Sequence, residues 1–204
     1  MLGGSSITDI IYVIVAIVIS LSIHEAMHAY ASHLLGDTTA QERGRLSLNP
    51  LKHIDPFATV VLPIITYVIF KIPILAAKPV PFNPDRLKFG EFGAALVAIA
   101  GPLSNILMAF IGALILAHVG ASTQVVDFLE TFVIINVAIF VFNIIPIPPL
   151  DGSRVLYAFA PEAVQDFMRS IEPYGIFIVF ALVLTGVITP IIANIDNAIL
   201  QNLP

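Results

Sequence analysis

The sequence contains no cysteine and no tryptophan, and it has few charged residues. The lack of cysteine excludes disulfides and thiolate metal ligands. Charged residues make up 11% of the chain, whereas ordinary soluble domains carry about 25%. With nine lysines and arginines and a net charge of −5, the composition predicts no nucleic-acid partner.

Apolar residues are abundant instead. They make up 58% of the 204 residues, and the mean hydropathy is +0.96. A chain of this length folded in water could not bury so much apolar surface in its core. We therefore expect a multi-pass protein of the cell membrane, with the lipid bilayer as its surroundings. The first apolar stretch follows no basic segment, so we interpret it as a retained helix and not as a cleaved signal.

The fold class expected is an all-α polytopic membrane protein. A membrane-spanning helix needs about 20 apolar residues. Four segments are long enough, and a fifth, residues 57–70, is shorter and either spans with the help of 72–75 or re-enters. The four predicted spans are 8–34, 92–118, 125–146 and 174–195.

Basic residues favour the re-entrant interpretation of 57–70. If that segment turns back, all nine lysines and arginines lie on one side of the membrane, as the positive-inside rule predicts for the cytoplasmic face. Two segments near this face, around 43–50 and 78–84, are rich in helix breakers. We expect both to be small extended or β segments that could clamp a substrate as an added strand.

The stretch "SIHEAMHAY" (22–30) places three polar side chains at the end of an apolar helix. His24 and His28 are four residues apart, so their imidazoles point the same way, one turn apart. His-Glu-x-x-His on a helix is the pattern in which two imidazoles bind zinc and the glutamate acts as general base. Ionisable groups inside a membrane are costly and therefore functional by default. We predict a zinc site at His24 and His28, with Glu25 as the catalytic base.

Catalytic zinc normally has three protein ligands and one open position. Asp37 and Glu42 lie in a polar loop, and Asp127 and Glu130 lie at the opposite membrane face. Asp151 follows a proline-rich break at the same membrane depth as the histidines. The turn "PPLDG" explains Asp151 equally well by its turn chemistry, but the missing ligand favours Asp151 as the third.

Together these residues resemble the site-2 protease family of intramembrane zinc metalloproteases. The family pairs His-Glu-x-x-His with a later Asn-x-x-Pro…Leu-Asp-Gly, here "HEAMH" (24–28) and "NIIPIPPLDG" (143–152). A Gly-Pro-x-x-Asn helix start is present as "GPLSN" (101–105). The sequences "GRLSLNPLKHIDP" and "AKPVPFNP" are similar to the short bacterial and archaeal branch.

The resemblance implies one zinc per chain on His24, His28 and Asp151, an active site near the cytoplasmic face, and Asn143 near the bound peptide. Asn143 could equally cap carbonyls freed by Pro146. Asn105 is a second substrate-binding candidate, with helix packing or capping as its alternative role.

The implied activity is hydrolysis of a peptide bond within or near a substrate's transmembrane helix. We expect residues 1–204 to form a single domain, without the PDZ or nucleotide-binding modules of many relatives. We expect a transmembrane-segment protein as substrate, and allow for a regulatory membrane partner or a dimer. Two alternatives stay open: an inactive membrane chaperone of the same fold, and a metal transporter. Glu25 argues against the chaperone, since zinc binding does not require it. The apolar outer halves of the helices argue against the transporter.

Overall fold

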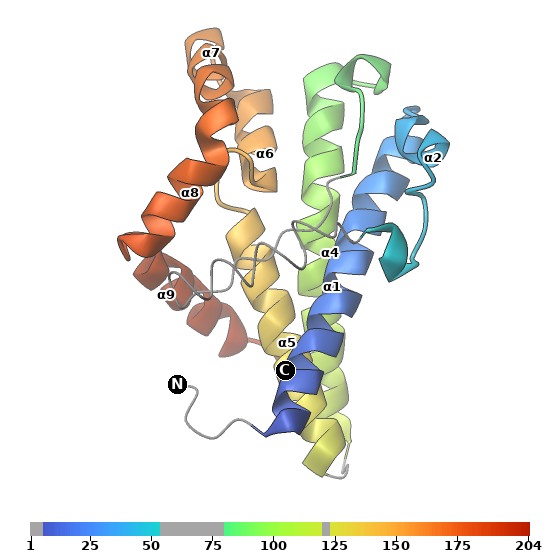
Figure 1. Ribbon diagram of the computed structural model, residues 1–204, viewed down its shortest axis with the longest axis vertical. Coiled ribbons are helices and arrows are strands. Elements are labelled where there is room, and N and C mark those ends of the chain that lie inside the picture. Colours follow the sequence, from blue (N-terminus) through green and yellow to red (C-terminus); the bar gives the residue numbers. More distant parts are fainter. Residues whose placement is uncertain (1–5, 54–79, 120–122) are drawn as a thin grey trace.

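The computed structural model describes residues 6–53, 80–119 and 123–204 (Figure 1). Within these ranges all regular structure is helical. Four helical segments are long and apolar enough to cross a membrane: Ile7–Leu34, Gly90–His118, Gln124–Asn143 and Glu162–Leu184. The predicted all-helical architecture with four apolar spans is confirmed for this part of the chain. The short hydrophobic segment 57–70 lies outside the described residues.

Three helices, α1 (Ile7–Leu34), α4 (Gly90–His118) and α5 (Thr123–Asn143), pack against one another as the core of the molecule (Figure 1). Small residues allow the close approach, as in α1, where Ala16 and Ser20 are fully buried. Large apolar side chains such as Ile10 and Ile14 instead point outward and are about half exposed. This distribution suits a helix bundle whose solvent is lipid.

The C-terminal part differs from the sequence prediction. A single helix over 174–195 was expected, but the chain forms a span from Glu162 to Leu184, and then breaks. Gly186, with a φ of 70°, lies in the left-handed region that ends helices, and the next helix begins at Thr189 with Pro190 in its first turn. The helices here are α6 (Asp151–Phe159), α7 (Glu162–Ile171), the 3-10 turn η4 (Glu172–Tyr174), α8 (Gly175–Leu184) and α9 (Thr189–Leu200).

The predicted extended or β segments are not supported, because no β-strand forms at either of them among the described residues. Residues 43–50 form turns whose backbone N–H groups bond locally, as Gly44 does to Gln41 and Arg45 to Ala40. Residues 80–83 form no regular structure, although the backbone of Asn83 is extended, and the N–H groups of Val80 and Asn83 donate to the carboxylates of Glu25 and Asp37. Short helices flank these stretches: α2 (Thr39–Glu42), η1 (Pro50–Lys52) and η3 (Pro84–Arg86).

Candidate metal centre

The two histidines of α1 meet the aspartate that begins α6. His24 and His28 are 3% and 7% exposed, and their Nε2 atoms lie 3.0 Å apart. Asp151 Oδ2 lies 3.1 Å from His24 Nε2 and 3.4 Å from His28 Nε2. The two histidines and Asp151, which lies more than a hundred positions later in the sequence, therefore form one compact group of potential metal ligands.

Helix α4 supports both imidazoles from one face. Val97, Gly101 and Asn105 are spaced four residues apart, so they lie above one another on the helix. The carbonyl oxygen of Val97 is 2.8 Å from His28 Nδ1, and Asn105 Oδ1 is 2.6 Å from His24 Nδ1. Gly101, between them, leaves room for the two rings. "GPLSN" thus contributes the glycine and the asparagine that this face requires.

The partners of the Nδ1 atoms determine where the imidazole protons lie. A carbonyl oxygen can only accept a hydrogen bond, so His28 donates through Nδ1–H to Val97. The amide orientation of Asn105 likewise places its oxygen toward His24. Neutral histidines in this state present an unprotonated Nε2. Both Nε2 lone pairs therefore face each other and the Asp151 carboxylate.

This arrangement fits a bound cation. Three acceptor atoms converge, and Asp151 Oδ2 is a buried atom without a hydrogen-bond donor among the described residues. Such a cluster of lone pairs is repulsive unless a positive charge lies between them. Two imidazole nitrogens and one carboxylate oxygen are the ligands of catalytic zinc, and tetrahedral bonds of about 2.0–2.1 Å separate ligand atoms by about 3.3 Å. The observed separations agree with that geometry.

Glu25, adjacent to His24, is 8% exposed. One of its oxygens, Oε2, accepts a hydrogen bond of 3.1 Å from the backbone N–H of Val80. The short segment 80–83 contains both Val80 and Asn83, and the Asn83 N–H donates to Asp37 over 2.6 Å. The segment is therefore fastened to the α1 side of the site by two carboxylates, one of them the predicted catalytic base.

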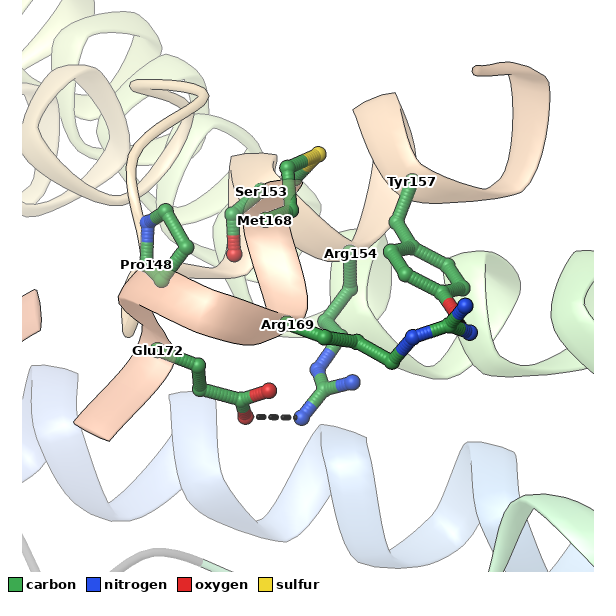
Figure 2. Close-up of a pocket in the computed structure, with 7 residues that line it drawn as sticks. All are labelled: Pro148, Ser153, Arg154, Tyr157, Met168, Arg169 and Glu172. Atoms are coloured by element: carbon green, nitrogen blue, oxygen red, sulfur yellow. Dashed lines mark hydrogen bonds and ion pairs between the residues drawn. The ribbon is translucent and has the colours of Figure 1, made fainter. Parts of the chain in front are cut away.

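Neighbouring helices hold α6, which begins at Asp151, and the turn before it. Gly175, the first residue of α8, packs so closely that an added Cβ would lie 2.4 Å from the Pro148 carbonyl oxygen. Arg154 of α6 pairs with Glu172 at 2.5 Å, and Arg169 bonds to the Tyr157 hydroxyl. Figure 2 shows these side chains around a small hollow between α6 and α7. The C-terminal helices thus fix the position of α6 and of the carboxylate at its start.

The two asparagines predicted to bind substrate occupy different environments. Asn143 ends α5, is half-buried, and donates through Nδ2 to the Ile139 carbonyl 2.9 Å away. Asn105 is fully buried and makes hydrogen bonds through both groups of its amide. Neither the Asn105 contact with His24 nor the part played by Asn136 was predicted. A lone asparagine in the apolar run "TFVIINVAIFVF" was the available signal for the latter.

Comparison with known proteins finds relatives that are named as zinc metalloproteases. The chain is 37% identical over 178 residues to "Putative zinc metalloprotease YwhC" of Bacillus subtilis, covering 83% of this chain and 78% of that protein. It is 28% identical over 180 residues to "Putative zinc metalloprotease Rip2" of Mycolicibacterium smegmatis, covering 86% and 67%. The Rip2 protein of Mycobacterium tuberculosis is 28% identical over 198 residues, covering 90% and 72%. No protein-family model and no solved structure matches the chain significantly.

The chain belongs to the site-2 protease family. Membership agrees with the four apolar helices, which make it a membrane protein, and with zinc as the cofactor that the three converging side chains fit. In this member of the site-2 protease family, the two sequence motifs are brought together by α4, whose glycine and asparagine contact the first motif.

Proposed function

We propose that this protein is an intramembrane endopeptidase that cleaves peptide bonds within or near the transmembrane helices of other membrane proteins. The observation that carries this proposal is the convergence of three acceptor atoms beside a buried glutamate. The site also lies inside a candidate membrane span, since His28 is six residues before the end of α1, or about 9 Å along the helix.

His24, His28 and Asp151 would hold one zinc ion. Zinc in such a site supplies a Lewis acid that makes water nucleophilic at neutral pH. Glu25 accepts a proton from the attacking water as the water oxygen adds to the scissile carbonyl carbon. Glu25 then gives that proton to the leaving amide nitrogen as the C–N bond breaks. The Val80 N–H holds Oε2 of Glu25 and leaves Oε1 for this transfer.

Other residues assist by position. Asn143 lies at the end of α5, where its amide could hold the substrate backbone, as the family resemblance implies. For Asn105, both amide groups are engaged inside the protein, which favours a supporting role over substrate binding. A substrate helix must unwind locally, since its carbonyls are otherwise hydrogen-bonded within the helix. We place the active site toward the cytoplasmic face because basic residues gather in the loops near it.

The test compares Glu25→Gln with wild type in cells whose membrane-protein fragments are quantified by mass spectrometry. Wild type should produce fragments that end within transmembrane segments, and Glu25→Gln should not, because loss of a general base costs about 10²–10⁴-fold in rate. Zinc content should be equal, because all three ligands remain. Glu91→Gln makes the same chemical change at an exposed position of α4 and should behave as wild type.

Identical fragments from wild type and Glu25→Gln, with zinc in both, would refute the protease. Asp151→Ala provides the complementary result. It should lose both cleavage and zinc, because two imidazoles alone bind zinc weakly. Full zinc content in Asp151→Ala would show that another residue is the third ligand.

A further inference from the structure

Two buried asparagines connect the His24 imidazole to the far side of the helix bundle. Asn105 of α4 and Asn136 of α5 are both 0% exposed. Asn105 Oδ1 is 2.6 Å from His24 Nδ1, and Asn105 Nδ2 donates to Asn136 Oδ1 over 2.9 Å. Asn136 Nδ2 then donates to the backbone carbonyl of Phe132 over 2.8 Å. The hydrogen bonds form one continuous chain across three helices.

This series of hydrogen bonds has only one favourable direction. The carbonyl of Phe132 accepts and cannot donate, so Asn136 must turn its NH₂ group toward it and its oxygen toward Asn105. Asn105 must then present its NH₂ group to Asn136 and its oxygen to His24. That oxygen requires a proton on His24 Nδ1. The Nε2 atom of His24, 3.0 Å from the corresponding atom of His28, is consequently left unprotonated.

Packing alone does not explain these two residues. Amide side chains are costly inside a membrane unless they are fully paired, and leucine would fill similar space at no such cost. His28 needs no such series of side chains, because its Nδ1 partner is the backbone carbonyl of Val97. A carbonyl can only accept a hydrogen bond, whatever surrounds it. His24 has a side-chain partner, and an amide that could flip would offer His24 either an acceptor or a donor.

We propose that Asn105 and Asn136 are positioning residues that hold His24 in the tautomer whose Nε2 is free to bind zinc. This inference rests on His24 being a zinc ligand, as in the proposed function, and it assigns a role to Asn136, a residue remote from the metal. Without the hydrogen bonds from Asn105 and Asn136, the His24 ring can rotate or carry its proton on Nε2. Zinc must then displace that proton. Hydrogen-bond partners of metal-bound histidines typically contribute 10- to 100-fold to metal affinity.

The first experiment measures zinc affinity of the purified full chain by competition with a chelator. Asn105→Leu and Asn136→Leu should each bind zinc about 10- to 100-fold more weakly than wild type. Ser104→Ala is the matched control, since Ser104 is the buried neighbour of Asn105 in α4 and its hydroxyl donates to the Gly101 carbonyl of the same helix. It should leave the zinc affinity unchanged. Because no substrate is present, the result does not depend on protease activity.

The second experiment separates positioning from general destabilisation. In the cobalt-loaded protein, proton NMR should show two exchange-protected imidazole N–H signals, one from each histidine. Asn105→Leu should lose the His24 signal and keep the His28 signal, whose partner Val97 is untouched. Wild-type zinc affinity in both leucine variants, or a protected His24 signal in Asn105→Leu, would overturn the proposal.

Discussion

Gly101 lies against the His28 imidazole so closely that no other residue fits. A Cβ built on Gly101 would be 2.4 Å from His28 Nε2 and 2.8 Å from His24 Cε1. The atom it would strike first is the nitrogen whose lone pair points at the metal position. The helix α4 therefore approaches the two rings as closely as a bare backbone allows.

Gly101→Ala should consequently abolish stoichiometric zinc binding. The methyl group must push the His28 ring off its position, and displacement of a ligand by about 1 Å ruins tetrahedral coordination. Zinc per chain, measured by elemental mass spectrometry on the purified protein, should fall well below one.

Gly112→Ala serves as its control on the same helix. There a Cβ would lie 2.8 Å from a Val133 methyl, remote from the histidines. This variant should unfold at lower temperature but keep its zinc. Loss of zinc from both variants alike would mean that the metal responds to bundle stability and not to the contact with His28.

The sequence was sufficient to predict that His24, His28 and Asp151 come together, as the structure shows, but not which groups support them. His24, Glu25 and His28 follow from spacing on one helix, and Asp151 from the need for a third ligand at equal depth. Their supports are tertiary contacts: a backbone carbonyl at Val97, a backbone N–H at Val80, and the buried amide of Asn136. Backbone partners leave no signature in a sequence, so the contacts of Val97 and Val80 could not be predicted, whereas Asn136 had a signal as a lone asparagine in an apolar run.

The limits of the helices could also be predicted only in part. The span predicted at 8–34 agrees with α1 because Ser6 caps its start through a capping box with Asp9. The span predicted at 174–195 was misplaced because its apolar run continues through the Gly186 break, and hydropathy does not register a backbone reversal. The β segments were predicted from proline and glycine content, which indicates only that a helix is absent.

The pH dependence of folding should include a contribution from Asp37. Burial by itself would raise the pKa of this carboxyl, but hydrogen bonds from Thr39 and from the Asn83 N–H, together with the Arg86 charge, lower the pKa below 3.8. A lowered folded-state pKa stabilises the fold above the unfolded-state value, and this stability is lost as pH falls through the folded-state value. Thermal unfolding in detergent should show a difference between wild type and Asp37→Asn at neutral pH that shrinks below about pH 4. A constant difference at all pH values would contradict this assignment.

The topology can be tested with single cysteines, because the natural chain has none. Arg43 and Arg86 are exposed and Arg154 is partly exposed, and the three lie in different turns or short helices. If all basic residues lie on the cytoplasmic side, each cysteine variant should react with a membrane-impermeant maleimide only in inverted vesicles. Labelling of position 86 from outside, with 43 labelled from inside, would show that residues 57–70 take part in a full crossing.

The hydrogen bond between Val80 and Glu25 predicts that one backbone N–H affects turnover without affecting the metal. Val80→Pro removes that donor alone, and the flanking Pro79 and Pro81 already favour the extended backbone that proline adopts. A hydrogen bond to a charged group contributes about 1.5–3 kcal/mol, so cleavage should slow by about 10- to 100-fold. Zinc content should stay at the wild-type level, because no ligand is touched.

Val80→Ala is the matched control, because it keeps the N–H and removes only the buried side chain. It should cleave much faster than Val80→Pro in the same membrane-fragment assay. Faster cleavage by Val80→Pro than by wild type would mean that segment 80–83 restrains Glu25 and must move away before a substrate is cut. Equal cleavage by both variants would mean that the bond has no part in catalysis, and that Glu25 is positioned by its helix alone.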